Sequence, residues 1–210
     1  MSVTIVRGEE ELFARTAHLF ATASEITCAA RDLNTWAATR PPADVPVQGT
    51  RPTVRKLYQP GALLNPSMAQ HVRTVAATPR AAVRITRDDV NETIIIDRRF
   101  AILAGDLADG RRSYGVVSEA AVVQNVASLF EAAWRSATDV AVYDAQHADL
   151  AKLAPRVLEL LASGCKDETA ARALGLGVRT YRRRVAELMT ALGAESRFQA
   201  GARARELGLI

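Results

Sequence analysis

Residues 178–192 are VRTYRRRVAELMTAL, and this stretch of the 210-residue chain carries two patterns at once. Apolar residues recur in it at spacings of three and four, which puts them on one side of a helix, and they are Val178, Tyr181, Val185, Leu188 and Leu192. The side chains of Arg179, Arg182 and Arg183 fall off that stripe. The stretch therefore predicts a helix with a buried side and a strongly basic outer side in its first two turns.

The sequence around this helix predicts a small all-α domain over residues 151–210. Strand patterns are absent there, and glycines at Gly164, Gly175–Gly177 and Gly193 divide the chain into four helical pieces. This size and spacing are typical of a helix-turn-helix domain, whose recognition helix places its first turns in the major groove. Arginines there can reach guanine edges with two hydrogen bonds. The alternative is a solvated basic face without a partner.

The distribution of charge agrees with an anionic partner for this domain. Residues 149–210 carry 11 basic and 7 acidic side chains, whereas residues 1–148 carry 16 of each, so the whole net charge of +4 lies in the last third. Such a basic module behind a neutral body predicts nucleic acid as the first candidate partner and a membrane surface as the second.

The rest of the chain predicts an α/β domain over residues 1–143, followed by a polar linker at 144–150. A helix is expected at 9–23, another from Asn65-Pro66, and a third from Ser118-Glu119 with a long apolar stripe. The expected strands are 25–30, 53–58, 81–86, 93–97, 100–104 and 114–118, with a tight turn at Arg98-Arg99. Five or six strands with three helices make a mixed α/β fold.

The last 47 residues resemble the DNA-binding domain of LuxR-type transcriptional regulators. The stretch is GCKDETAARALGLGVRTYRRRVAELMTALGAESRFQAGARARELGLI, and the resemblance rests on four motifs: Leu174-Gly175-Leu176, Arg179-Thr180, Leu192-Gly193-Ala194 and Ser196-Arg197-Phe198-Gln199-Ala200. The resemblance implies that the third helix reads the major groove and that the fourth commonly forms a dimer contact. The sequence departs from the family pattern at Gly177, Tyr181 and Arg184, where Ser, Val and His are usual. It departs again at Ala151 and Ala154, which replace the Thr and Glu that are usual in the first helix.

The same resemblance implies a role for each candidate DNA-binding residue. Arg182 and Arg183 would contact base edges. The residues that would lie near phosphates are Lys166, Arg179, Thr180 and Arg184.

Residues 90–97, VNETIIID, resemble the core strand of phospholipase D-like domains, in which His-x-Lys is followed by four residues and Asp. The resemblance puts Val90 at the position of the nucleophile and Glu92 at that of the lysine, and only Asp97 is retained. Hydrolysis of a phosphodiester in that family needs an imidazole to attack phosphorus and a cation to hold the phosphate oxygens. The resemblance therefore implies an inactive domain, without catalytic residues, that senses a ligand or sets a dimer.

The residues that could bind a small molecule or a peptide in this domain are Trp36, Tyr58, Asn91 and Glu92. Trp36 and Tyr58 could edge a pocket beside the proline-rich loop 40–52, and Asn91 and Glu92 stand where the ancestral active site would be. The alternative for Trp36 is packing against the body of the domain.

Several classes of protein are disfavoured by composition. Cys28 and Cys165 have neither a second Cys nor a His at metal-ligand spacing, and no window is long and apolar enough to cross a membrane. No cofactor or metal is expected, and the N-terminus lacks a signal-peptide pattern, which predicts a cytoplasmic protein.

Together these features predict a transcriptional regulator, not an enzyme, that binds double-stranded promoter DNA as a homodimer. Two alternatives stay open: a phosphodiesterase-like hydrolase with an accessory helical domain, and a protein-interaction regulator that has lost DNA binding.

Overall fold

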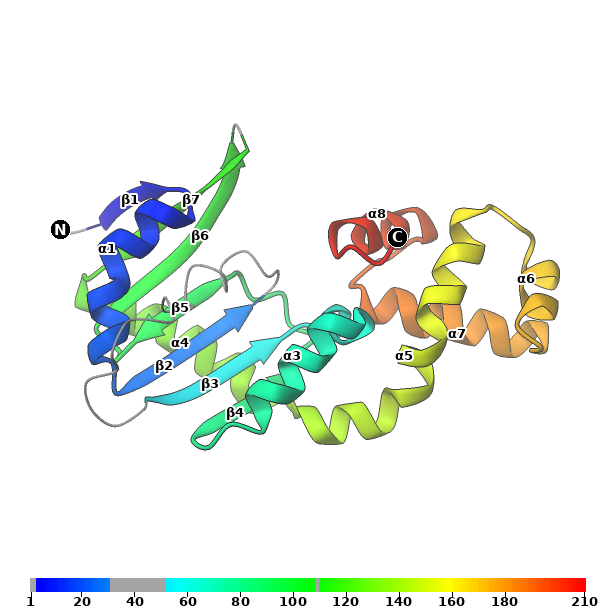
Figure 1. Cartoon of the computed structure of the whole chain (residues 1–210), viewed down its shortest axis with the longest axis horizontal. Helices are drawn as coiled ribbons and strands as arrows, with labels where there is room; N and C mark the ends of the chain where they lie inside the picture. Colours follow the sequence, from blue (N-terminus) through cyan, green and yellow to red (C-terminus); the bar gives the residue numbers. More distant parts are fainter. Residues whose placement is uncertain (1–2, 31–51, 109) are drawn as a thin grey trace. The chain divides into compact units, whose positions relative to one another are not determined.

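The computed structural model describes residues 3–30, 52–108 and 110–210, and the chain in it divides into two compact units (Figure 1). The sheet unit contains residues 1–58 and 75–137. The helical unit contains residues 59–74 and 138–210. The predicted fold class, a mixed α/β part with helices at the C-terminal end, is confirmed at that level.

Where the structure describes it, the sheet unit contains seven strands in the order β1-β7-β6-β5-β2-β3-β4. The strands are β1 (Val3–Arg7), β2 (Glu25–Ala30), β3 (Thr53–Tyr58), β4 (Ala81–Ile85), β5 (Thr93–Ile96), β6 (Phe100–Ala108) and β7 (Arg111–Val117). Neighbours β2, β3 and β4 run parallel, and the other pairs run antiparallel. The sequence predicted all of these strands except β1.

Among the described residues, two helices accompany this sheet, α1 (Glu9–Thr22) and α4 (Ala120–Ser136). Helix α4 lies behind the sheet in the view of Figure 1. Its apolar stripe packs on one sheet face, and the shared core consists of Ala29, Leu57, Ile95, Ala101, Val117, Val123, Ala127, Phe130 and Ala133. The apolar side chains that recur every three or four residues on α4 therefore pack on the strand side chains that point to this face, as the sequence predicted.

The turn between β5 and β6 is centred one residue earlier than the sequence predicted. Asp97 and Arg98 both have positive φ, 50° and 55°, and the Arg99 amide donates to the Ile96 carbonyl over 2.9 Å. Positive φ at both central residues is typical of the type I′ hairpin turn, whose twist matches that of the two strands it connects. Asp97 Oδ1 also accepts from the amides of Ser24 and Glu25, each over 2.8 Å, so this carboxylate holds the start of β2.

The helical unit combines a short segment from the middle of the chain with its C-terminal third. It contains the 3-10 helix η1 (Pro60–Leu64), most of α3 (Pro66–Ala76), the short strand segment β8 (Thr138–Asp139), α5 (Val140–Ala162), α6 (Asp167–Ala173), α7 (Val178–Ala191) and α8 (Arg197–Glu206). Asn65 caps α3, because its Oδ1 accepts from the amides of Ser67 and Met68. Its Nδ2 donates to the Leu207 carbonyl over 3.3 Å.

The predicted linker at 144–150 is wrong, because these residues lie inside α5. The side chains of Val140, Tyr143, Leu150 and Ala154 are buried at helical spacing, so the polar residues between them occupy the outer side of one continuous helix. Pro155 lies within this 23-residue helix, which bends in Figure 1. A proline inside a helix removes one N–H donor and displaces the preceding turn, which accounts for a bend.

The predicted domain boundary is also wrong, because residues 59–74 belong to the helical unit. Leu64 is buried in the same core as Leu158, Tyr181 and Leu188. A Cβ added to Gly61 would come within 2.9 Å of Leu207 Cδ1, so η1 packs closely on the end of the chain. The helical unit therefore extends beyond the predicted range 151–210, both before residue 151 and into the middle of the sequence.

Glycine ends both helices of the predicted helix-turn-helix. Gly175 and Gly193 have φ of 66° and 64°. After α6 the Leu176 amide donates to the Ala171 carbonyl over 2.8 Å, and after α7 the Ala194 amide donates to the Met189 carbonyl over 2.9 Å. These bonds satisfy carbonyls at the helix ends that would otherwise have no partner.

Gly175→Ala is expected to lower the free energy of unfolding by about 1–2 kcal/mol, because a Cβ disfavours the left-handed conformation. An added Cβ would meet nothing within 4 Å, so the loss would come from the backbone alone. Chemical denaturation of the full chain measures it. Gly201→Ala is the control, since Gly201 lies inside α8 without a positive φ and an added Cβ would meet nothing within 4 Å, and an equal loss in both variants would contradict the explanation.

Candidate nucleic-acid interface and ligand cavity

Helix α7 buries its predicted apolar side against the helical core. Tyr181, Val185 and Leu188 are at most 3% exposed, and Val178 packs at the margin of the same core. Helix α6 precedes α7 through the tight turn at Gly175, so the two helices form a compact pair. The exposed arginines Arg179, Arg182 and Arg183 therefore lie on the opposite, outer side of α7.

The six predicted DNA-binding residues separate into two groups. Lys166, Arg179, Arg182 and Arg183 are exposed. Thr180 and Arg184 are half-buried. The structure therefore brings four of the six to the surface of the α6–α7 pair.

Arg182 is held by acidic groups at the start of α6. Its Nε donates to Asp167 Oδ2 over 2.7 Å, and Glu168 Oε1 lies 3.6 Å from its NH2 group. The same Asp167 carboxylate accepts from Arg197 of α8, over 2.8 and 3.2 Å. Asp167 is 13% exposed, whereas the Arg182 side chain is 59% exposed. One carboxylate thus connects α6, α7 and α8 and fixes the direction of an exposed guanidinium.

Arg184 differs from its neighbours because it turns toward the rest of the helical unit. It is 20% exposed and pairs with Glu187 over 2.8 Å and with Asp149 over 3.7 Å. Its Nε atom is buried without a hydrogen-bond partner among the described residues. The predicted phosphate contact is therefore at odds with the position of Arg184, which lies three residues after Tyr181 and four before Leu188.

The sequence did not single out Asp167 and Arg197 as parts of this site. Asp167 begins α6, where a carboxylate is favourable for the helix dipole, and that local role predicts no partner. Arg197 lies in the motif Ser196-Arg197-Phe198-Gln199-Ala200, for which the resemblance implies no contact with Arg182. Their pairing with Arg182 depends on the packing of three helices.

Lowering the pH from 5 to 2 is expected to remove the stabilisation that Asp167 provides. Hydrogen bonds from Arg197 and then Arg182 lower the pKa of Asp167 to about 2. A carboxyl whose pKa is lower in the folded state stabilises the protein above its unfolded pKa, near 4, and loses this effect as the pH falls toward 2.

The measurement is thermal unfolding of the wild type and Asp167→Asn at each pH. The variant is expected to be less stable by about 1–2 kcal/mol at pH 6 and equal to the wild type near pH 2. A difference that does not change with pH would exclude this carboxylate as its source.

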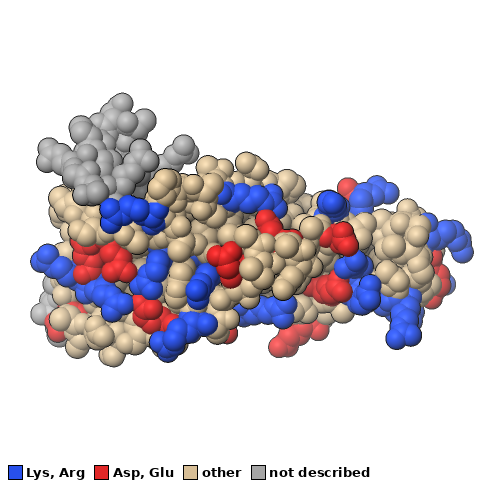
Figure 2. All heavy atoms as spheres, turned by 90° about the horizontal axis from the view of Figure 1, so that it is seen from below, with Lys and Arg blue, Asp and Glu red and all other residues tan. Residues whose placement is uncertain are grey.

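The surface is not uniformly basic. On the face seen in Figure 2, Lys and Arg side chains lie beside Asp and Glu side chains over both units. On α7 itself, Arg183 Nε lies 3.6 Å from Glu187 Oε1. Any nucleic-acid interface at α7 would therefore depend on a few exposed basic side chains and not on a broad positive surface.

The predicted ligand residues have three different fates. Trp36 and loop positions 40–51 lie outside the described residues. Tyr58 is 1% exposed, within the sheet core. Asn91 and Glu92 line one cavity of about 650 Å³, together with the rest of segment 88–93, two residues of β6 and five of α4. We call it the α4 cavity; its members from β6 and α4 are Leu103, Ala104, Val126, Leu129, Phe130, Ala132 and Ala133.

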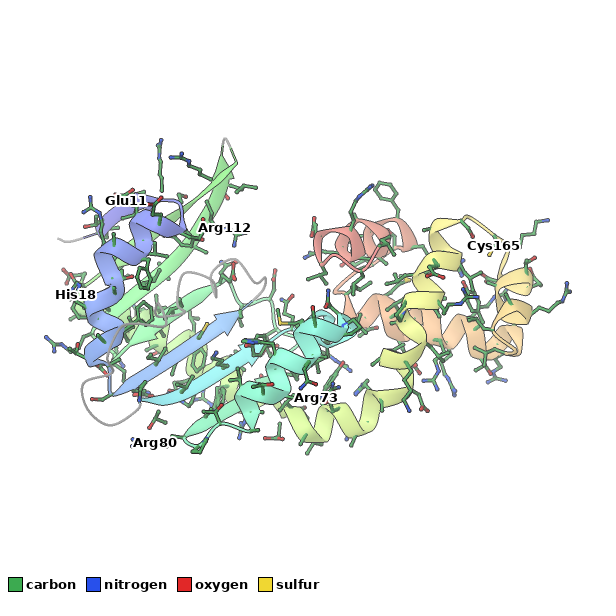
Figure 3. The ribbon with its side chains drawn as sticks, viewed as in Figure 1. Glu11, His18, Arg73, Arg80, Arg112 and Cys165 are labelled. Carbon is green, nitrogen blue, oxygen red and sulfur yellow. The ribbon has the colours of Figure 1, made fainter. Side chains whose placement is uncertain are left out.

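Glu92 is a buried carboxylate, and it forms an ion pair with Arg112 of β7, which is labelled in Figure 3. The Glu92 side chain is 3% exposed and that of Arg112 is 20% exposed. On β2 and β3, Cys28 lies opposite Lys56 in the strand register. Burial raises the pKa of Cys28 to about 12 and lowers the pKa of Lys56 to about 8. The side chains of Glu92, Cys28 and Lys56 are all buried, which is consistent with a structural role.

The three positions of the phospholipase D-like motif do not form one polar centre. Val90 packs beside the α4 core, Glu92 pairs with Arg112, and Asp97 binds the backbone at β2. Within residues 3–30, 52–108 and 110–210, no three His, Cys, Asp or Glu side chains are grouped so that they could hold a metal ion. No helix among these residues is long and apolar enough to cross a membrane.

One curated relative is similar in sequence. It is the bialaphos biosynthetic pathway regulatory protein of Streptomyces hygroscopicus, which is 32% identical over 145 residues, covering 69% of this chain and 55% of the relative. The chain thus spans about half the length of the relative it matches. No protein-family profile matches the chain.

Among solved structures the similarities are distant. NucT from Helicobacter pylori is 10% identical with a TM-score of 0.49, covering 66% of this chain and 99% of that one. A phospholipase D family member, Nuc from Salmonella typhimurium, is 11% identical with a TM-score of 0.47, covering 66% and 98%. TrmBL2, an archaeal chromatin protein, is 20% identical with a TM-score of 0.45, covering 67% and 54%.

Proposed function

We propose that the protein is a transcriptional regulator that binds double-stranded promoter DNA through α7. The observation that carries this proposal is the outer side of the α6–α7 pair, where Lys166, Arg179, Arg182 and Arg183 are exposed over a tightly packed helical core. Arginine at the first turns of such a helix suits guanine edges, and lysine beside it suits phosphate. The 32% identity to a protein named as a pathway regulator supports the same assignment.

The helical unit is proposed to be of the LuxR type. The support is the glycine-ended turn between α6 and α7 and the fourth helix, α8, which Ser196 caps by accepting from the Gln199 amide over 3.1 Å. Phe198 on α8 is 88% exposed. In LuxR-type domains the helix at this position commonly forms the dimer contact, and we therefore propose a homodimer in which Phe198 lies at the contact.

The sheet unit is proposed to bind a regulatory ligand without catalysing a reaction. The α4 cavity supports ligand binding, because its volume of about 650 Å³ falls within the range of small-molecule sites. Val90 supplies no nucleophile, and the Glu92 carboxylate is paired with Arg112. Hydrolysis of a phosphodiester would need a nucleophile and a cation at these two positions.

The test is binding of the full chain to DNA from upstream of its own gene and to a scrambled duplex of equal composition, over a series of salt concentrations. Selective binding that weakens as salt rises is expected, since each phosphate contact releases a counterion. The double variant Arg179→Ala, Arg183→Ala should bind both duplexes poorly. Equal binding of the two duplexes by the wild type at every salt concentration would reject the assignment.

A matched control distinguishes the effect of losing two positive charges from the effect of losing contacts made by α7. Lys152→Ala together with Arg156→Ala removes two exposed basic side chains of α5, outside the α6–α7 pair. Its binding is expected to stay within about threefold of the wild type, because surface charges remote from the DNA act only through a screened field. A loss equal to that of the α7 variant would place the interface elsewhere.

A further inference from the structure

The α4 cavity has an apolar floor and a polar rim. Phe130 and Ala133 are buried at its floor, and the half-buried Val90, Leu103 and Val126 pack against the same core. Asp88, Asp89 and Asn91 are exposed, which places them at the rim. The cavity can therefore enclose an apolar group while a polar group remains near solvent.

Leu129 adds apolar surface at this rim. It lines the cavity and is 70% exposed, although the neighbouring Phe130 is 3% exposed. A bound apolar group would cover this side chain and remove its surface from water, which is favourable. A volume of about 650 Å³ fits a small organic molecule and is too small for a folded partner.

The charge of the lining has one sign. Its ionisable members are Asp88, Asp89 and Glu92, and neither Lys nor Arg belongs to the lining among the described residues. Glu92 is neutralised by Arg112. Asp88 Oδ2 accepts from the hydroxyl of Ser136 over 2.8 Å, and this hydrogen bond brings no positive charge to the rim.

We propose that the α4 cavity binds a small organic cation, an amine that carries an apolar group. The apolar group lies against Leu103, Val126 and Phe130, and the ammonium group donates to Asp88. A charge-assisted hydrogen bond of this kind discriminates against anions of the same shape. This inference deepens the proposed ligand-binding role of the sheet unit and rests on it, because it names the chemical class of the ligand.

Three probes of similar shape test the sign of the charge: 2-phenylethylamine, 2-phenylethanol and 3-phenylpropanoate, titrated calorimetrically into the full chain at pH 7. The amine is expected to bind with a dissociation constant of roughly 0.1–1 mM, as suits a ligand of nine heavy atoms. The alcohol should bind at least about tenfold more weakly, and the carboxylate should not bind measurably. Equal binding of amine and carboxylate, or saturable binding of none, would overturn the proposal.

Two variants test the location. Asp88→Asn should weaken amine binding at least about tenfold and leave alcohol binding unchanged, because only the charge is lost. Ala132→Trp, at an exposed position of the lining, should fill the cavity and abolish both. Glu10→Gln removes an exposed carboxylate of α1 and should bind like the wild type. If Ala132→Trp binds the amine normally, the cavity is not the site.

Promoter binding is measured on the same proteins without any probe. Asp88→Asn and Ala132→Trp are expected to bind DNA as the wild type does, and their far-ultraviolet circular dichroism reports whether they fold. Loss of amine selectivity with intact DNA binding overturns the ligand class alone. Absence of DNA selectivity in the wild type, with amine binding intact, overturns the regulator function alone.

Discussion

Arg182→Ala is expected to weaken binding to the preferred promoter sequence by about 1–3 kcal/mol, roughly 5- to 150-fold, and to bind scrambled DNA nearly as the wild type does. The reason is that the Arg182 guanidinium is exposed yet held in one direction by Asp167, so it can meet a guanine edge with little loss of side-chain freedom. Fluorescence anisotropy with labelled duplexes measures both affinities.

Lys166→Ala is the contrasting variant for this prediction. A lysine that meets phosphate should contribute equally to every sequence, so its loss should lower affinity for both duplexes and reduce the salt slope by about one unit. Asp167→Asn is the third variant of this comparison, because it removes the carboxylate that holds the Arg182 guanidinium and leaves that guanidinium charged. Arg182→Ala with unchanged selectivity would show that Arg182 does not contact a base.

Arg112→Ala is expected to lower the free energy of unfolding by about 3–5 kcal/mol, the largest loss of stability foreseen for a single substitution here. It leaves the Glu92 carboxylate, 3% exposed, without its arginine in the interior of the sheet unit. Part of the loss should be recovered in the double variant Glu92→Gln, Arg112→Ala, since the buried charge is then removed as well.

Arg111→Ala is the matched control, because Arg111 precedes Arg112 on β7 and is exposed. Its effect should stay within about 0.5 kcal/mol, as for most surface positions. Urea denaturation followed by circular dichroism measures all four proteins. Similar losses in the Arg111 and Arg112 variants would mean that β7 itself, and not the ion pair, is responsible.

Local patterns were enough to predict most of the elements. Strand β2 was predicted with both of its ends, and α7 to within one residue, because short apolar runs and helical spacing are properties of neighbouring residues. Strand β1 was missed since four of its five residues are exposed, which removes the alternation that marks a half-buried strand. The linker was predicted where polar residues in fact form the outer side of α5.

The candidate sites were predicted less well than the elements, for the same reason. Helical spacing placed Arg182 and Arg183 on the outer side of α7, and the same spacing could have marked Arg184 as a residue beside the buried stripe. The ion pairs of Asp167 with Arg182 and Arg197 join three helices, and the α4 cavity joins segment 88–93 to residues of α4 that lie 33 to 45 positions later. Such long-range contacts leave no local pattern.

The discontinuity of the helical unit has a consequence for how such genes can recombine. A crossover anywhere between the codons for residues 75 and 137 would transfer α5 to α8 but leave η1 and most of α3 with the other parent. The Leu207 contacts of Gly61 and Asn65 would then join residues of two different lineages. Exchange of the whole chain keeps these contacts together, so inheritance of both units as one piece is the favoured outcome.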